Sequence, residues 1–228
     1  MQKQDEISKW TIVKTKNYER IIEVLNNAFE YSLLYCLIGY SGAGKSTAFK
    51  AFLAENKNAV YLRLDKTYSK KDLYVSLLRL FDQHEYGYDI HVRFLAEKLA
   101  TLIEKRPGKS IIILDDAGRL SAPQLEYLQA IFDSGEGKLG FIISGTAKFH
   151  NDFKKWVRTE KLGIPELETR IHSWEILDRP PISELKGVAS KNGIVDANDL
   201  TAIVKGCKDF RTLRARVLDY KIKLSKKT

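Results

Sequence analysis

The stretch "GYSGAGKST", residues 39–47, restricts the possible folds of this 228-residue chain more than any other feature. Its glycines at 39 and 44, with Lys45 and Ser46 after them, fit the spacing GxxxxGK[ST] of a phosphate-binding loop. That loop requires a strand before it and a helix after it. The apolar run at 33–38 and the segment "STAFKAFLAE" meet both requirements. A parallel α/β architecture with a nucleotide site is therefore predicted.

Each part of the loop has an expected task. The glycines permit turns that point backbone N–H groups inward, and the N-terminus of the following helix favours an anion. Lys45 is expected to reach the β and γ phosphates of ATP, and Ser46 to offer its hydroxyl to Mg²⁺. The predicted ATP-binding residues are Gly39, Tyr40, Ser41, Gly42, Ala43, Gly44, Lys45, Ser46 and Thr47.

Short apolar runs indicate the strands of the sheet. Four are continuous, at 33–38, 59–64, 110–115 and 139–144, and a weaker alternating run at 171–177 fits an edge strand. Segments with helical spacing separate them, which predicts a parallel five-stranded sheet sandwiched by helices.

The pattern changes after "DRPP" at 178–181, where only helices are expected, at about 182–192, 197–206 and 209–224. Residues 1–181 are thus predicted to form the core with an N-terminal lead-in, and 182–228 a small helical lid.

Positive charge is concentrated in the predicted lid. The formal net charge is +9, and residues 201–228 hold nine basic residues against two acids, a balance of 9 − 2 = +7. This favours a polyanionic partner, with a solvated basic face as the alternative. No apolar run is long enough to span a bilayer and the N-terminus lacks a signal-peptide pattern, so we expect a cytoplasmic protein with no membrane partner.

The cysteines and histidines show no metal-ligand spacing. Cys36 and Cys207 are expected to be buried, reduced thiols, and the four histidines form no ligand pattern. A metal site built only of protein ligands is not expected.

Paired acids end the third run, in "IIILDD". A phosphate-binding loop needs a carboxylate on an adjacent strand to hold Mg²⁺, and Asp115 is the candidate, together with Ser46. Asp116 is the candidate catalytic base or water-positioning residue. Its side chain is one methylene shorter than the Glu usual at this place, which predicts slow hydrolysis.

The order of these motifs resembles that of an AAA+ ATPase across roughly residues 15–225: the phosphate loop, "IIILDDAGRL", "FIISGT", an arginine before the fifth strand and "DFRTLR" in the lid. The resemblance implies that Ser144 or Thr146 acts as sensor 1. It also implies that Arg170 is an arginine finger toward a neighbouring subunit and that Arg211 is sensor 2. The alternatives are an ordinary surface arginine at 170 and membership of the basic face at 211.

Among AAA+ proteins the compact build and basic lid resemble the transposition regulators of the Mu B, TnsC and IstB type. This implies assembly of copies of the chain into rings or filaments on duplex DNA and recruitment of a transposase. Three alternatives stay open: a helicase loader or replication initiator of the DnaC or Cdc6 kind, a small-molecule P-loop kinase, and a non-hydrolysing ATP-dependent scaffold.

The loop "LDKTYSKKD" at 64–72 is the first candidate for DNA contact, with a solvated loop as the alternative. Contacts to phosphates should make binding sequence-tolerant and salt-dependent. The candidates are Lys66, Thr67, Lys70 and Lys71, with Tyr68 as a packing aid, then Arg119, and then Lys148, Lys154 and Lys155.

The lead-in "WTIVKTKNY" at 10–18 is a candidate flap on the adenine side of the nucleotide. Its apolar residues Ile12, Val13 and Tyr18 precede the phosphate loop. Ordinary packing of a lead-in segment is the alternative.

Overall fold

The computed structural model describes residues 9–82, 86–87 and 89–226. Its centre is a parallel sheet of five strands in the order β2-β3-β4-β1-β5. The strands are β1 (Leu34–Ile38), β2 (Ala59–Arg63), β3 (Ser110–Asp115), β4 (Leu139–Gly145) and β5 (Ile171–Ile176). All five predicted strands are confirmed, and the weak fifth one lies at the edge as predicted.

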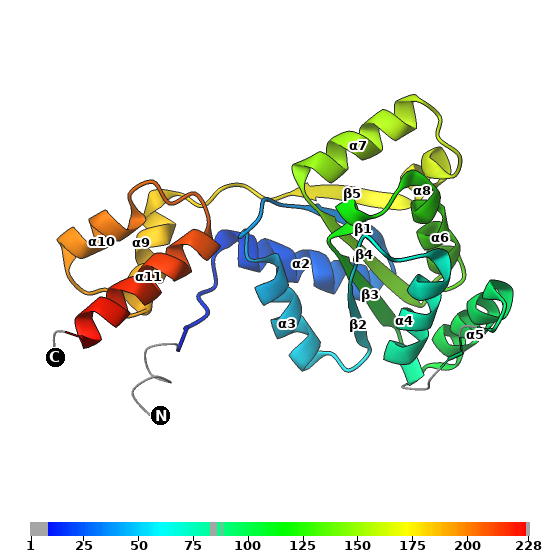
Figure 1. Ribbon diagram of the computed structural model, residues 1–228. Coiled ribbons are helices and arrows are strands. Elements are labelled where there is room, and N and C mark those ends of the chain that lie inside the picture. The colour runs from blue at the N-terminus through cyan, green and yellow to red at the C-terminus, as the bar shows by residue number, and fades with distance from the viewer. Residues whose placement is uncertain (1–8, 83–85, 88, 227–228) are drawn as a thin grey trace.

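Helices cover both faces of this sheet (Figure 1). One face packs against α2 (Lys16–Tyr31) and α3 (Lys45–Glu55). The other packs against five helices and a short 3-10 turn. These are α4 (Lys70–Asp82), α5 (Val92–Lys105), η1 (Ala117–Arg119), α6 (Ala122–Asp133), α7 (Ala147–Arg158) and α8 (Ile164–Arg170).

Alternation along the strands produces two hydrophobic cores, one on each face. In β1, Cys36 and Ile38 belong to the core under α4–α8, whereas Tyr35 and Leu37 belong to the core under α2 and α3. Because every β1 residue is buried, its sequence is an uninterrupted apolar run. The predicted α/β sandwich is confirmed.

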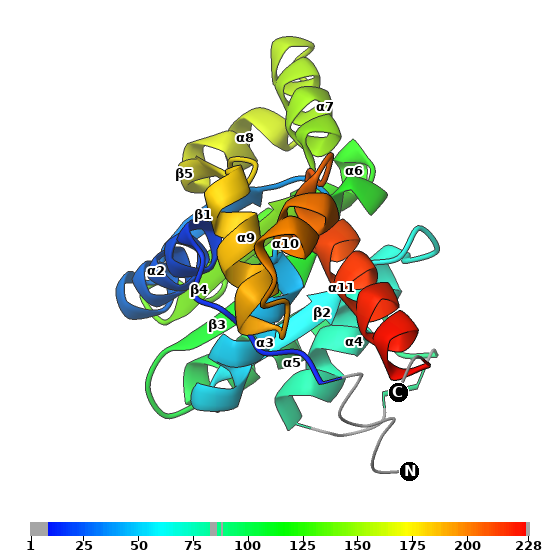
Figure 2. The same cartoon turned by 90° about the vertical axis from the view of Figure 1, so that its left-hand side faces the viewer.

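The lid is a separate helical cluster with its own core, beside the sheet in Figure 1 and in front of it in Figure 2. Its helices α9 (Ile182–Lys191), α10 (Ala197–Val204) and α11 (Phe210–Ser225) match the three predicted ones. Asp196 and Asp209 cap α10 and α11 by accepting hydrogen bonds from backbone N–H groups of the first turn. The domain boundary at 181 stays a prediction.

The lead-in lies against the lid. Trp10 and Val13 pack on the lid core, and Asn192 clamps the backbone of Thr11, accepting from its N–H at 2.8 Å and donating to its carbonyl at 3.1 Å. The segment that the sequence assigns to the core therefore contacts the lid before it enters α2.

Cys36 and Cys207 are buried and unpaired, as predicted, and burial raises the pKa of each thiol. In the described part of the chain, no helix combines the length and apolar character needed to cross a membrane.

Candidate nucleotide site

The phosphate loop joins β1 to α3 through two glycines in the left-handed region, Gly42 at φ +85° and Gly44 at φ +92°. A side chain at either position would strain the backbone. Gly44 precedes α3 and offers no side chain to cap it, and the first turn of α3 contains no acid. The positive end of α3 is thus available for an anion.

Lys45 lies across this loop. Its Nζ donates to the carbonyl of Gly39 at 2.8 Å and to that of Tyr40 at 3.3 Å. Burial lowers the pKa of Lys45, while the negative charges of Asp115 and Asp116 act in the opposite direction. The ammonium group therefore lies between the loop and the paired acids, where phosphate is expected.

Asp115 ends β3 and is 4% exposed. Three hydroxyls hold its carboxylate: Ser46 Oγ and Tyr61 OH each lie 3.1 Å from Oδ2, and Ser144 Oγ lies 3.0 Å from Oδ1. The predicted pair of Ser46 and Asp115 is thus brought together, and a hydroxyl beside a carboxylate suits the oxygen preference of Mg²⁺.

Tyr61 is a contact that the sequence reasoning missed. It lies on β2, the strand next to β3, and burial together with the negative charge of Asp115 raises its pKa, so the phenol stays a hydrogen-bond donor. Alternation along β2 was the sequence signal that could have identified Tyr61. Tyr61 and Arg63 are two residues apart, so both side chains lie on the same side of the strand.

Asp116 has an unusual backbone for a residue with a side chain, with φ +62° and ψ +36°. Its carboxylate forms an ion pair with Arg63, whose Nε lies 2.8 Å from Oδ2. Strained residues of this kind concentrate at functional sites. The candidate base is thus held at the edge of the site by an arginine that the sequence reasoning did not single out.

These groups surround a cavity of about 330 Å³. It is lined by Trp10, Ser41, Gly42, Ala43, Gly44, Lys45, Ser46, Thr47, Arg63, Asp115, Asp116, Thr146, Phe210, Arg211 and Arg214. Thr146 reaches this cavity, whereas Ser144 is fully buried and bonded to Asp115. Of the two sensor 1 candidates, only Thr146 therefore faces the space for phosphate.

The lid touches the phosphate loop directly. Arg211 Nη1 donates to Ser41 Oγ at 2.8 Å, and the N–H of Phe210 donates to the carbonyl of Gly42 at 3.1 Å. The predicted lid arginine is thereby brought to the loop. A cation at this position complements the negative charge of a nucleotide.

A smaller cavity of about 60 Å³ adjoins the loop on its apolar side. The predicted flap residues Ile12, Val13 and Tyr18 line it, together with Trp10, Thr15, Gly44, Thr47, Val188 and Phe210. Core, lead-in and lid all contribute to this apolar space.

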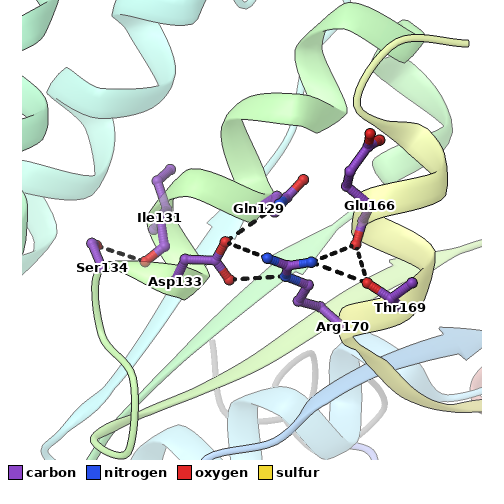
Figure 3. Close-up of polar contacts among 7 residues, drawn as sticks. All are labelled: Gln129, Ile131, Asp133, Ser134, Glu166, Thr169 and Arg170. Atoms are coloured by element: carbon purple, nitrogen blue, oxygen red, sulfur yellow. Dashed lines mark hydrogen bonds and ion pairs between the residues drawn. The ribbon is translucent and has the colours of Figure 1, made fainter.

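Arg170 lies outside both cavities, at the end of α8 (Figure 3). Its guanidinium group contacts both carboxylate oxygens of Asp133 at 3.3 Å and donates to Thr169 Oγ1 at 3.0 Å and to the carbonyl of Glu166 at 3.3 Å. An action of Arg170 on a neighbouring subunit would require these bonds to break.

The predicted DNA-contact residues occupy several elements. Lys66, Thr67, Lys70 and Arg119 are exposed, and Lys71 is half-buried. Thr67 and Lys70 already have internal contacts: Thr67 donates to Asp65 from its N–H and its hydroxyl, and Lys70 Nζ lies 3.9 Å from the centre of the Tyr127 ring. The second-choice residues Lys148, Lys154 and Lys155 are exposed on α7, where Lys148 pairs with Asp152.

This fold and this cavity define a P-loop nucleotide-binding protein. A family model described as an AAA domain matches residues 30–152, more than half of the chain. The chain therefore belongs to this AAA family of P-loop ATPases.

Several solved structures have the same fold. The chain is similar to the Orc1 protein of Aeropyrum pernix in complex with DNA, with a TM-score of 0.71 and 12% identity over 97% of this chain and 63% of that one. For Cdc6p of Pyrobaculum aerophilum the TM-score is 0.68 and the identity is 12%, over 93% of this chain and 63% of that one. For the Walker-type ATPase of Pyrococcus abyssi the TM-score is 0.65 and the identity is 17%, over 95% of this chain and 73% of that one.

At these identities the likeness shows the fold alone, and the chain spans only 63% of the length of the Orc1 and Cdc6p chains. No curated protein sequence matches the chain. The family and the similar structures do not single out the transposition-regulator type that the sequence resemblance favoured.

Proposed function

We propose that this protein is an ATP-hydrolysing AAA ATPase of the cytoplasm that assembles on duplex DNA in the manner of a replication initiator or helicase loader. The likeness to Orc1 and Cdc6p supports this choice over transposition, because these two are replication-initiator proteins and the Orc1 structure is in complex with DNA. The likeness to Orc1 covers 97% of this chain, so it includes both core and lid. The proposed protein partner is a replicative helicase.

The residues around the cavity suit ATP and Mg²⁺. Ser46 and Asp115 would hold the metal, which neutralises phosphate charge during transfer. Lys45 would bind the β and γ phosphates, and Asp116 would orient the attacking water. Because Asp116 is paired with Arg63, slow turnover in the unassembled protein is expected.

One observation carries the coupling between nucleotide and assembly: the start of α11 is bonded to the phosphate loop. Arg211 and Phe210 contact Ser41 and Gly42, two residues that also surround the space for phosphate. Phosphate in the loop would therefore lie beside the contacts that position the lid, and we expect it to change them. A protein that binds DNA through both its core and its lid would then change its DNA binding when the bound nucleotide changes.

The test is duplex binding by the full chain with ATP, a non-hydrolysable analogue or ADP, and with Lys45→Ala. Lys50→Ala is the matched control, since Lys50 is exposed one turn later on α3. We expect ATP-dependent binding by the wild type and the control, and none by Lys45→Ala. Equal binding with and without nucleotide would disprove the coupling.

Electron microscopy of the same mixtures tests assembly. Rings or filaments that need both ATP and DNA are expected, and a uniform monomer would contradict the proposal. Pull-down with the full chain then identifies the protein partner. A replicative helicase is expected, whereas a transposase would favour the transposition function predicted first from the sequence.

A further inference from the structure

α11 carries a second arginine on its cavity side, Arg214, in addition to Arg211. Arg214 follows Arg211 by three residues, so the two share one side of the helix. The start of α11 is fixed to the phosphate loop by Phe210, and both arginines line the cavity of about 330 Å³. Arg214 is exposed to that space.

Arg214 is held by an aromatic ring in place of an acid. Its guanidinium carbon lies 5.7 Å from the centre of the Trp10 ring. Within the described part of the chain, no acidic side chain forms an ion pair with Arg211 or Arg214. A guanidinium group binds phosphate in a two-pronged, charge-assisted arrangement that is stronger than an exposed cation–π contact.

The charges around the cavity lead to the same conclusion. Arg63 is neutralised by Asp116, and Asp115 is the proposed metal partner. The two lid arginines thus add positive charge to the cavity that no acidic side chain among the described residues neutralises in an ion pair. The triphosphate of ATP carries one more phosphate group than ADP and therefore makes better use of a second cation.

Trp10 fixes where Arg214 can reach. Asn192 clamps the residue after Trp10 through both its N–H and its carbonyl, so the ring has a defined position against the lid. Trp10 lines both the phosphate cavity and the small apolar cavity, whereas Arg214 lines only the former. The arginine therefore belongs to the phosphate end of the site and not to its apolar end.

We propose that Arg214 is a second lid arginine that binds the terminal phosphate of ATP, and that Trp10 holds it in place until the nucleotide arrives. This inference rests on the nucleotide site of the proposed function but requires neither DNA binding nor a partner. Arg214 would then make the protein distinguish ATP from ADP, and the Trp10 ring would sense the exchange.

The experiment measures Mg²⁺-dependent binding of ATPγS and ADP to the full chain by calorimetry, without DNA. Arg214→Ala should weaken ATPγS binding about tenfold, the effect of losing one charge-assisted contact, and ADP binding less than about threefold. The ATPγS affinity of Arg214→Lys should lie between those of the wild type and Arg214→Ala. Lys223→Ala, an exposed cation near the end of the same helix, should match the wild type.

Tryptophan emission gives an independent measurement. ATPγS should change the emission of the wild type, and Trp10→Phe should abolish the change, because the other two tryptophans, Trp156 and Trp174, do not line the cavity. A full change retained in Trp10→Phe would overturn the role of Trp10.

An equal loss of ATPγS and ADP binding in Arg214→Ala, or no loss, would overturn the role of Arg214. So would a defect confined to duplex binding, which would make Arg214 a DNA contact. Since no DNA is present in the calorimetry, discrimination lost in Arg214→Ala would support this inference even if ATP-dependent DNA binding failed.

Discussion

Replacing Ser144 by alanine removes one of three hydroxyls that hold a buried carboxylate. Ser144 is fully buried, and its Oγ lies 3.0 Å from Asp115 Oδ1. A hydrogen bond to a charged group contributes about 1.5–3 kcal/mol. Because Asp115 keeps two donors on its other oxygen, we expect the lower end, about 1.5 kcal/mol of the unfolding free energy.

For a chain of this size about 1 kcal/mol corresponds to a shift of about 2–4 °C in Tm. Ser144→Ala should therefore melt about 3–6 °C below the wild type when no nucleotide is present. Urea unfolding gives the free energy directly, with the m-value as a check that the unfolded state has not changed.

Thr146→Ala is the matched comparison, since Thr146 lines the cavity and makes no capping bond through its side chain. Its stability should stay within about 0.5 kcal/mol of the wild type, while ATP turnover falls. Combining Ser144→Ala with Asp115→Asn in a double-mutant cycle should give a coupling of at least about 0.5 kcal/mol.

Full stability combined with lost turnover in Ser144→Ala would contradict a supporting role of Ser144 for Asp115. That result would mean that Ser144 faces the phosphate as a sensor and does not support Asp115. A coupling of zero between Ser144 and Asp115 would equally contradict their hydrogen bond.

Three other outcomes follow from the structure. Because burial lowers the pKa of Lys45 below its usual 10.5, the charged form is lost earlier as pH rises, so affinity for ATPγS should already fall as the pH rises from neutral toward 10.5. Calorimetry over this range should find a flatter profile for Lys45→Arg, and a flat wild-type profile would contradict the shift. Gly140→Ala should cost about 3 kcal/mol of stability, because its Cβ would lie 2.2 Å from a backbone carbonyl of α2. Gly187→Ala, in open space on α9, should gain about 0.4–1 kcal/mol by urea unfolding, and equal effects at both glycines would exclude the steric explanation. Asp133→Asn should remove the ion pair of Arg170, leaving it only its contacts with Thr169 and Glu166, and should raise ATPase turnover at high protein concentration, whereas Arg170→Ala should abolish that rise. No effect of either change on turnover would identify Arg170 as an ordinary surface residue.

The architecture could be predicted because the central strands are short, continuous apolar runs. Strands buried on both faces need mostly apolar residues: all five buried residues of β1 are apolar, and in β3 only the terminal Ser110 and Asp115 are polar. The edge strand β5 has only one strand neighbour and partial burial, so its run is weaker, but the alternation was enough to find it. The order of strands does not follow from such runs, because it depends on how helices cross the sheet.

The candidate site was predictable only where its residues are adjacent in sequence. The phosphate loop and the paired acids each form a local motif, and Arg211 came from a family resemblance. Tyr61 and Arg63 could not be assigned, because they reach the acids only when β2 pairs with β3. Trp10 and Arg214 meet through the packing of the lead-in on the lid, between segments far apart in the chain.

The flap predicted from the sequence would place the adenine at the apolar cavity, and the packing of lead-in on lid would then make binding of the base and of the phosphates depend on each other. Gly42 leaves room for the lid, since a Cβ there would lie 2.6 Å from Asp209 Oδ1, and Asp209 caps the helix that carries both arginines. The apolar cavity beside the loop needs lead-in, lid and core together to form its walls. A lid that moved away from the phosphate loop would thus open the apolar cavity and withdraw the arginines in one step. Weak binding of the base and weak binding of the terminal phosphate should therefore occur together, in any variant that undocks α11 from the loop.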